Sequence, residues 1–525
     1  KIDFDQFNGG TKFHGKNKAL AVYKEALTDA NLRCLTYPNP VATIFDLDFD
    51  TIAEQFTFTR GSEATFVNEQ GLIQSTNELG PELIINGSFA TDSDWSKGPG
   101  WSINGGKANC DGTQTSNTNL NNSSSNGLVN NKTYKVVYTI SNHTSGSIRV
   151  KAGNTGYGEY HSSNGTYTQY LIAQVTSFPF VQFIADSNFT GSIDNVSVKE
   201  VISATNTPRI DYSTGAEAFL LEPQSTNLVT YSEDFSSLNL RDNAVVTSNE
   251  VISPSGDLNA DKITFGGLAH SRVEASIPAT IGQPYTISVY LKNKDLSNPA
   301  QVWIGFSAAS QGQFVTITDE WQRYDITTNA DGTTEYPRIQ FSGTGSLYAW
   351  GFQTEQQSYP TSYIPTDGAS ATRNQELCVD ATPVINSEEG TLYAEISALA
   401  NDGTFRIISL TDGSTSNRVS LIYNTTNNSF RIMVVSGSTI FDEQHTVTST
   451  LDFHKVAIKY KANDFAVWID GGEVATGTSG ATPIGLDRIT FDVGNGTLNF
   501  FGNTKGLKYY PKALADVQYE DLTTI

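Results

Sequence analysis

Apolar and polar residues alternate along most of the chain after about residue 43. In residues 285–292, YTISVYLK, every second side chain from Tyr285 to Leu291 is apolar, which is typical of a half-buried strand. Residues 454–474, HKVAIKYKANDFAVWIDGGEV, predict two strands around a Lys-Ala-Asn-Asp turn, followed by a Gly-Gly turn. The pattern therefore predicts an all-β protein.

One segment near the start has the period of a helix instead. In residues 17–35, NKALAVYKEALTDANLRCL, apolar side chains recur at steps of three and four, and the YPNP sequence at 37–40 ends the pattern. We predict a helix at 17–35 within a small N-terminal region, residues 1–55. This helix either packs on its own domain or docks onto a larger assembly.

The middle of the chain contains an internal duplication. Four pairs of weakly similar segments occur in the same order, at a nearly constant spacing of about 150 residues. This spacing is too long for a solenoid repeat and suits two copies of one β-sandwich. The paired segments are 86–95 with 231–240, 132–142 with 283–293, 165–173 with 319–327, and 191–198 with 345–352.

Composition narrows the possible partners. The chain has 525 residues and a formal net charge of −22, so it would repel nucleic acid and anionic membranes. Its three cysteines, Cys34, Cys110 and Cys378, are widely spaced and form no C-x-x-C motif, which argues against a zinc site or a disulfide framework. No apolar run is long enough for a membrane helix, and we expect no membrane insertion.

Several quoted stretches resemble a module of bacteriophage virion structural and tail-fibre-like proteins. They are FTRGSEATFVNEQGLI (58–73), NTPRIDYSTGAEAFLLEPQSTNLVTYSEDF (206–235), LNADKITF (258–265) and YAWGFQTEQQSYPTSYIPTDGASATR (348–373). Residues 374–525, with GTLYAEISAL and the ending GLKYYPKALADVQYEDLT, resemble a concanavalin A-like sandwich of the LamG/pentraxin type.

The resemblance implies a domain plan and a fold class. Residues 81–200 resemble a CenC-like jelly roll, 228–366 a second carbohydrate-binding-module jelly roll, and 367–525 the concanavalin A-like sandwich. Segments 56–80 and 201–227 would connect them. The expected fold is all-β: tandem jelly-roll β-sandwiches plus a concanavalin A-like sandwich, behind an N-terminal region with one helix.

Two stretches with little chemistry mark the expected borders. The stretch YPTSYIPTDGASATR (359–373) would be an ordered strap that Tyr359 and Tyr363 anchor to the second jelly roll, and FTFTRGSEATF (56–66) would play the same part upstream.

The sequence shows no catalytic constellation. The third domain lacks the E-x-D-x-E string of concanavalin A-like glucanases, and no G-x-S-x-G, H-E-x-x-H or Walker A motif occurs in the chain. Glu389 and Glu395 are six residues apart with neutral residues between them. We therefore predict no catalytic residues and a protein that is not an enzyme.

Aromatic side chains are the candidate ligand contacts, because sugars stack their apolar faces on aromatic rings. Tryptophan is also a common core residue, and repeat-matched Trp321 and Trp350 are expected in the core. The candidates for carbohydrate binding are Trp95, Trp101, Tyr157, Tyr160, Trp303 and Trp468.

The resemblance also implies a possible structural calcium ion, with no other cofactor required. Jelly rolls often hold calcium between their first and last strands through oxygen ligands. Asn86 in INGSF and Asp194 in SIDNVSV occupy the corresponding places. The alternative is that Asp194 is a turn or cap residue.

These observations lead to one functional expectation and two alternatives. We expect a virion appendage, on the surface of an extracellular particle, that binds host-surface or environmental glycans without catalysis. Other virion proteins would hold its N-terminal region, and the resemblance implies a homotrimer. The alternatives are a purely structural virion decoration or fibre shaft, and a secreted glycan-processing enzyme with accessory modules.

Overall fold

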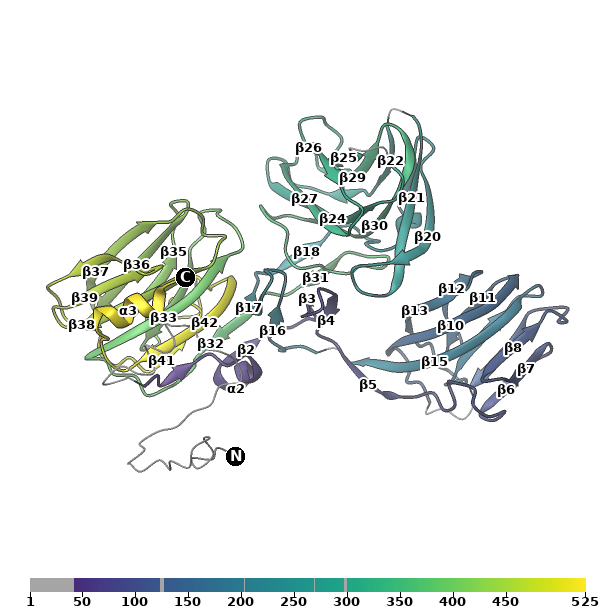
Figure 1. Cartoon of the computed structure of the whole chain (residues 1–525), viewed down its shortest axis with the longest axis horizontal. Helices are drawn as coiled ribbons and strands as arrows, with labels where there is room; N and C mark the ends of the chain where they lie inside the picture. The colour runs from purple at the N-terminus through teal and green to yellow at the C-terminus, as the bar shows by residue number, and fades with distance from the viewer. Residues whose placement is uncertain (1–41, 123–126, 203, 269, 297–299) are drawn as a thin grey trace, which may run out of the picture.

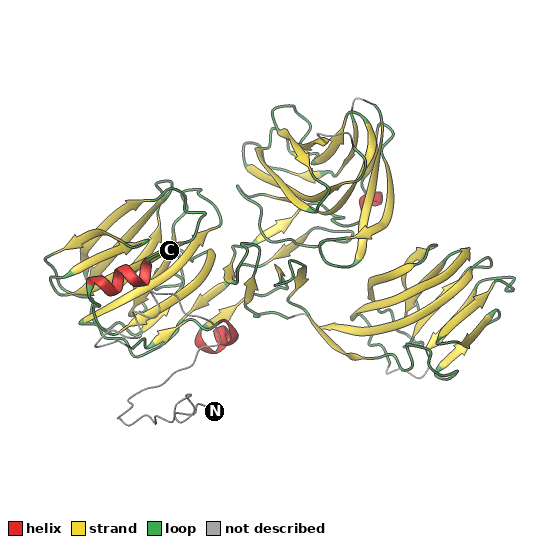
Figure 2. Cartoon of the chain, in the orientation of Figure 1, coloured by secondary structure: helices red, strands yellow, loops and turns green. Residues whose placement is uncertain are grey.

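The computed structural model describes residues 42–122, 127–202, 204–268, 270–296 and 300–525. The helix predicted at 17–35 lies outside the described residues. Figure 1 shows three β-sandwiches arranged around a small central region, which we call the hub, and Figure 2 shows that strands account for almost all of the regular structure. The all-β prediction is confirmed.

The first sandwich packs two antiparallel sheets around one core. The core includes Tyr134, Val136, Ile148 and Phe183, all buried, which alternate with outward-facing residues as in any two-sheet sandwich. One sheet has the order β13-β10-β15-β8-β7, with β5 also paired to β15, and the other has the order β12-β11-β14-β9-β6. The bounds are β5 Glu78–Glu82, β6 Trp95–Lys97, β7 Trp101–Asn104, β8 Lys107–Asp111, β9 Thr118–Asn122, β10 Thr133–Ser145, β11 Ile148–Ala152, β12 Gly156–His161, β13 Gly165–Ile172, β14 Val181–Ala185 and β15 Thr190–Ile202.

The second sandwich repeats this plan. Its sheets have the orders β27-β24-β30-β21-β20 and β26-β25-β29-β22-β19, with a small β23–β28 pair beside them. The bounds are β19 Asn239–Arg241, β20 Val245–Ile252, β21 Leu258–Gly266, β22 Ser271–Glu274, β23 Ile277–Pro278, β24 Pro284–Asn293, β25 Ala300–Gly305, β26 Gly312–Ile317, β27 Gln322–Asn329, β28 Thr334–Glu335, β29 Arg338–Phe341 and β30 Thr344–Glu355, with the short helix η2 at Phe235–Ser237.

The two sandwiches correspond strand by strand. When β23 and β28 are set aside, β6 to β15 match β19 to β30 in chain order, and the neighbours in both sheets are the same. The segments that are similar in sequence fall on equivalent strands, such as β10 with β24 and β15 with β30. The internal duplication is therefore confirmed as a duplicated jelly roll.

The third sandwich includes more of the chain than residues 367–525. Strands β1, β16 and β17 extend its large sheet, which has the order β16-β17-β42-β33-β38-β39-β40 with β1 paired to β42. Phe45, Ile52, Phe56 and Phe219 are buried in its core, so parts of 1–55 and of both expected connectors, 56–80 and 201–227, belong to this sandwich. The sequence did not predict that these segments belong to the third sandwich, because they are short and lie far from residues 367–525 in the chain.

The elements of the third sandwich have the following bounds. The large sheet contains β1 Phe45–Asp46, β16 Arg209–Asp211, β17 Ala218–Leu221, β33 Glu389–Ala398, β38 His454–Lys461, β39 Phe465–Ile469, β40 Gly472–Gly477 and β42 Gly502–Tyr510. The second sheet, in the order β37-β36-β35-β34-β41, contains β34 Arg406–Thr411, β35 Asn417–Tyr423, β36 Ser429–Ser436, β37 Ser438–Thr446 and β41 Arg488–Thr490. The helices are η1 Phe49–Thr51, α2 Ile52–Gln55 and α3 Asp516–Thr523.

The hub consists of three short strand pairs. The chain passes from the hub into each jelly roll and back into the hub. The pairs are β2 Thr57–Thr59 with β32 Leu377–Val379, β3 Thr65–Val67 with β4 Ile73–Ser75, and β18 Ser225–Asn227 with β31 Ala371–Arg373. The backbone N–H of Ala204 donates to Asn77 Oδ1 at 3.2 Å, so the chain returns from the first jelly roll beside the point where it left. The β18–β31 pair closes the second jelly roll in the same way. Each jelly roll is thus an insertion in a unit formed by the hub and the third sandwich.

Five buried charged residues hold the hub together. The three arginines come from before, between and after the insertions, and they surround two carboxylates. Arg60 contacts Glu376 at 2.7 Å, Arg209 contacts Glu222 at 2.8 Å and also Glu376, and Arg373 contacts Glu222 at 2.8 Å. Burial would raise the pKa of Glu222, but Arg373 and Arg209 outweigh it and hold this pKa at about 2. The network joins segments that the sequence separates by hundreds of residues.

The stretch 359–373 crosses this hub as a packed strap. Tyr363 is buried against Trp350 of the second jelly roll, with ring centroids 4.5 Å apart, and its hydroxyl donates to Glu233 Oε1 at 2.9 Å. Tyr359 is also buried, but its ring faces Arg406 of the third sandwich at 6.0 Å. Tyr363 therefore anchors the strap to the second jelly roll as expected, and Tyr359 ties it to the third sandwich.

Candidate functional site

Two of the six aromatic candidates are core residues of the first jelly roll. Trp95 is 6% exposed and packs on Phe89 at 4.8 Å, while Trp101 is 7% exposed and packs on Phe189 at 6.2 Å. The prediction that they contact sugar is therefore wrong. Each lies at the start of a short strand whose alternation turns the indole inward, although glycine-rich sequence surrounds both.

Trp468 is also buried. It lies on β39, 8% exposed, and stacks on Tyr519 of helix α3 with ring centroids 6.0 Å apart. The helix covers this face of the large sheet, so the prediction that Trp468 contacts sugar is wrong as well. Trp350 is a core residue as expected, whereas Trp321 is only partly buried and donates its indole N–H to the carbonyl of Ile252 at 3.0 Å.

Tyr157 and Tyr160, by contrast, are exposed at 48% and 52%. Both lie on strand β12 at the edge of the five-stranded sheet, and their odd spacing would normally place them on opposite faces. A bulge between the pairs Arg149–Tyr160 and Lys151–Tyr157 turns both rings to the outer face. The guanidinium carbon of Arg149 lies 4.0 Å from the Tyr157 ring centre and 4.6 Å from that of Tyr160.

Lys151 and Phe178 extend this surface. The Lys151 ammonium is 5.7 Å from the Tyr157 ring and 5.5 Å from the Phe178 ring. Because Ile148, Val150 and Ala152 of β11 point into the core, Arg149 and Lys151 face outward. We call Arg149, Lys151, Tyr157, Tyr160 and Phe178 the first face. It offers aromatic rings beside hydrogen-bond donors, the combination with which proteins hold sugars.

The cations of the first face have no carboxylate partner in the described part of the chain. Neither Arg149 nor Lys151 takes part in an ion pair within 4.0 Å there, and Arg149 Nε is buried without a hydrogen-bond acceptor. Burial and the neighbouring Arg149 both lower the pKa of Lys151. The face therefore carries a locally positive charge on a chain whose formal net charge is −22.

The equivalent sheet of the second jelly roll carries Trp303. Its ring packs edge-on against Phe314, with centroids 5.3 Å apart, and Phe314 is 58% exposed. Trp303 lies opposite both Phe314 on β26 and Gln340 on β29. We call Trp303, Phe314 and Gln340 the second face. Strands β25 and β26 correspond to β11 and β12, so both repeats present aromatic residues at the same edge of the same sheet.

The arginines beside the second face are all paired. Arg272 contacts Asp242 at 2.7 Å and Glu274 at 2.8 Å, and Arg241 contacts Glu274 at 3.1 Å. Arg338 lies 3.7 Å from Glu274. The second face therefore has aromatic rings and an amide but no unpaired cation among these residues, which distinguishes it from the first face.

Asn86 and Asp194 do not form a calcium site. The side-chain amide of Asn86 donates to the backbone carbonyls of Thr91 and Ser93, and its Oδ1 accepts the N–H of Thr91 at 3.4 Å. The backbone carbonyl of Asn86 accepts from the Trp95 indole at 2.9 Å.

Asp194 lies inside strand β15, opposite Thr139 at a register shift, and its Oδ1 accepts the N–H of Asn195 at 2.7 Å, so it is a bulge residue within a strand and not a turn or cap residue. In the described ranges, no group of three or more Asp, Glu, His or Cys side chains converges on one point. The residues present do not fit the ion.

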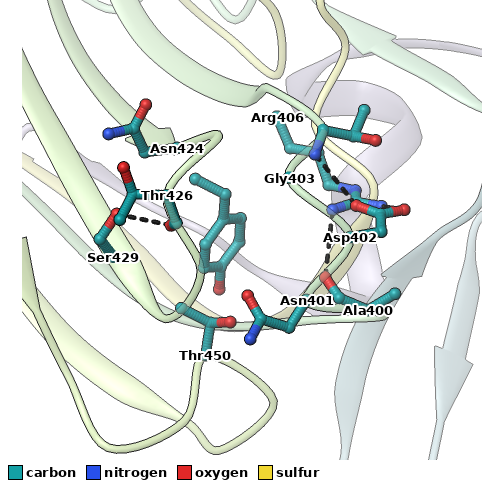
Figure 3. A pocket seen from close by; sticks show the side chains of 11 residues that line it. Ala400, Asn401, Asp402, Gly403, Arg406, Asn424, Thr426, Ser429 and Thr450 are labelled. Atoms are coloured by element: carbon teal, nitrogen blue, oxygen red, sulfur yellow. Dashed lines mark hydrogen bonds and ion pairs between the residues drawn. The ribbon is translucent and has the colours of Figure 1, made fainter.

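The third sandwich has a small polar hollow at one end (Figure 3). Its volume of about 10 Å³ is that of a single water site. Arg406 fills one side of it, paired with Asp402 at 2.9 Å and donating to the carbonyl of Ala400 at 3.2 Å. The hollow is too small for a sugar ring, and the Arg406 guanidinium on its wall also lies 6.0 Å from the ring of Tyr359 in the strap.

Sequence reasoning missed Arg149, Lys151, Phe178, Phe314 and Gln340. Arg149 and Lys151 alternate with apolar residues in IRVKA, which marks them as outward-facing on a strand, and Phe314 follows Trp303 across a hairpin. These residues could therefore have been predicted from the sequence. The bulge that places Tyr157 and Tyr160 on the same face could not, because it depends on the pairing of β12 with β11.

The comparisons with known proteins are distant. No family model and no curated protein matches the chain. A tandem of CBM22 modules from Paenibacillus barcinonensis Xyn10C is 9% identical, covers 54% of this chain and 98% of its own, and has a TM-score of 0.20. Trypanosoma rangeli sialidase is 10% identical over 89% of this chain and 98% of its own, with a TM-score of 0.23. The Sulfolobus Turreted Icosahedral Virus structure is 10% identical over 86% of this chain and 97% of the matched chain, with a TM-score of 0.18. TM-scores this low carry no argument about ligand or activity.

No helix in the described residues is long and apolar enough to cross a membrane. The chain is an all-β protein with two tandem jelly rolls and a third sandwich built around a shared hub.

Proposed function

We propose that this chain is a non-catalytic glycan-binding protein that holds saccharides on the first and second faces. The observation that carries the proposal is the repetition itself. Two copies of one jelly roll place aromatic rings at the same edge of the same sheet, although the residues differ: the exposed Tyr157 and Tyr160 in one, and the half-buried Trp303 beside the exposed Phe314 in the other. Exposed aromatic rings on a rigid sheet suit stacking of sugar rings.

The sequence resemblance adds the setting. We propose that the protein belongs to the surface of a phage virion, with its N-terminal region held by other virion proteins, and that it forms a homotrimer. Each face alone would bind weakly, and display of two faces per chain in an oligomer would raise avidity through effective concentration.

The hub favours a second function. Buried ion pairs between Arg60, Arg209, Arg373, Glu222 and Glu376 tie both insertions to the third sandwich. Such an arrangement also suits a purely structural decoration or shaft protein, in which the jelly rolls are spacers. Only the exposed faces separate the two functions.

Glycan retention by the full chain tests the proposal. The wild type and the variants Tyr157→Ala and Trp303→Ala would be run on an array of neutral and acidic glycans. We expect each variant to lose retention of the glycans bound by its own face. Tyr170→Ala is the matched control, because Tyr170 is a 56% exposed tyrosine on the other sheet of the first jelly roll. Retention that neither Tyr157→Ala nor Trp303→Ala changes would overturn the glycan-binding function and leave the structural one.

A further inference from the structure

The first and second faces differ in charge. The difference lies in whether their arginine and lysine side chains are paired with carboxylates. On the first face, Arg149 and Lys151 face outward between exposed rings and have no carboxylate within 4.0 Å in the described part of the chain. On the sheet of the second face, Arg241, Arg272 and Arg338 each contact Glu274. The outer surface of this sheet therefore carries two cations without a carboxylate partner among the described residues in the first jelly roll, whereas the three arginines on the corresponding sheet of the second jelly roll are paired.

We infer that the first face recognises an acidic saccharide, with the tyrosine rings stacking on the sugar and Arg149 and Lys151 contacting its carboxylate or sulfate, while the second face takes neutral sugar. This inference rests on the proposed function and names the ligand class of each face.

The geometry supports an acidic ligand in two ways. The Arg149 guanidinium lies 4.0 Å from the Tyr157 ring centre and 4.6 Å from that of Tyr160, so contacts with two rings restrict its position before a ligand binds. A preorganised guanidinium loses little conformational freedom when it binds a planar carboxylate or a sulfate. Lys151 lies on the same strand two residues further on, beside Tyr157 and Phe178. An acidic group near Tyr157 would thus meet both cations.

The charge of the whole chain makes the site selective. A formal net charge of −22 repels polyanions in general, so a polyanion would be retained only where the local field is reversed. Retention must then require the tyrosines as well as the cations. That joint requirement separates a stacked acidic sugar from nonspecific attraction to positive charge.

Two matched pairs of polysaccharides serve as probes for the full chain. Dextran sulfate and dextran share a backbone and differ in sulfate, and polygalacturonate and its methyl ester differ in the free carboxylate. We expect at least one acidic member to bind at least about tenfold more tightly than its neutral partner. Arg149→Gln, Lys151→Gln and Tyr157→Ala should each remove most of that preference. Which pair responds distinguishes a sulfated from a carboxylated ligand.

Two variants serve as controls. Arg272→Gln removes a cation that is already paired, next to the second face, and Lys135→Gln removes a cation 5.7 Å from the exposed Tyr170 ring on the other sheet. Neither should change the preference for the acidic member.

The outcomes separate this inference from the proposed function. If Tyr157→Ala lowers binding equally for both members of each pair, and Arg149→Gln does not, the face binds neutral sugar and the inference is overturned while the proposed function stands. If an acidic probe binds but Tyr157→Ala leaves that binding unchanged, the attraction is nonspecific and the inference is also overturned. If neither Tyr157→Ala nor Trp303→Ala changes retention of any probe or array glycan, both fail.

Discussion

Arg60 and Glu376 are 316 positions apart in the chain, and their side chains meet at 2.7 Å with no exposure to solvent. Both lie at the base of the insertions, and Glu376 also contacts Arg209. Because Glu376 contacts both Arg60 and Arg209, it joins the buried charges of the hub into a single cluster. The stability of the hub should therefore depend strongly on the Glu376 carboxylate.

Removal of that carboxylate should destabilise the hub strongly. Glu376→Ala leaves Arg60 and Arg209 buried with one fewer counter-charge, and breaking a buried pair in this way typically costs about 3–5 kcal/mol. Urea unfolding and limited proteolysis of the full chain would detect an early transition and cleavage near the hub. Asp442→Asn removes the exposed partner of Arg431 and should cost no more than about 1 kcal/mol. Equal effects of the two variants would show that the cluster does not hold the hub.

The hub should also weaken in acid. The folded-state pKa of Glu222 is about 2, below the ordinary value of 4.5, so its contribution is complete above pH 4.5 and is lost as the pH falls towards 2. The melting temperature of the hub transition should drop over this window. The Glu222→Gln variant should have a lower melting temperature than the wild type at pH 4.5, and its melting temperature should change less as the pH falls. A wild-type profile as flat as that of the variant between pH 4.5 and 2 would contradict the assignment.

The two jelly rolls should respond oppositely to mild acid. Burial lowers the pKa of His161, in the first, from 6.5 to about 4, so its contribution to stability is lost as the pH falls from 6.5 to 4. Burial raises the pKa of Glu233, in the second, from 4.5 to about 7, so the folded state binds the proton more tightly and stability rises as the pH falls from 7 to 4.5.

Hydrogen exchange of the full chain, read peptide by peptide, measures both responses at once. Between pH 7 and 4.5, after correction for intrinsic exchange, protection should fall in the strands around His161 and rise in those around Glu233. His161→Phe should reduce the loss of protection in the first jelly roll. Glu233→Gln should reduce, without abolishing, the gain in the second, because burial also raises the pKa of Asp261 there to about 7 and this group acts in the same direction. A shared direction in both jelly rolls, unaffected by either variant, would rule out these two groups as the cause.

Trp468 and Trp303 should separate stability from binding. Trp468→Ala opens a cavity between β39 and helix α3, and such truncations cost about 3–5 kcal/mol. It should lower the melting temperature of the third sandwich and leave glycan retention intact. Trp303→Ala should do the reverse, because this ring packs on the sheet surface against the exposed Phe314. Loss of retention in Trp468→Ala at a temperature where it is folded would place a ligand site on the third sandwich.

Periodicity and repetition predicted much of this structure. The alternation in 285–292 predicted strand β24, and the four weak segment matches predicted that the second jelly roll duplicates the first. Both signals are local or evenly spaced. The extent of the third sandwich was not predictable in this way, because β1 and β17 reach it only through pairing with the distant β42.

The candidate site was predicted in part for a similar reason. The sequence named Tyr157, Tyr160 and Trp303 as candidate sugar contacts, and the structure places the two tyrosines on the surface and leaves Trp303 half-buried. It misplaced Trp95, Trp101 and Trp468, because the direction of an indole depends on which face of a sheet becomes the core. The sequence did not identify Arg149 as a site residue, because its contacts with the rings of Tyr157 and Tyr160 depend on the bulge between β11 and β12.

The pairing of β1 with β42 also determines when the protein can finish folding. Asp46 on β1 and Lys508 on β42 form a 3.0 Å ion pair and are 462 positions apart in the chain. Strand β1 therefore cannot pair with β42 until the ribosome has synthesised nearly the whole chain. At ribosomal rates of about 5–20 residues per second, that wait lasts roughly 20–90 s. The two inserted jelly rolls contain only nearer partners and can fold during synthesis. The nascent chain therefore carries two finished domains while Phe45, Ile52 and Phe56 still lack the core that will bury them.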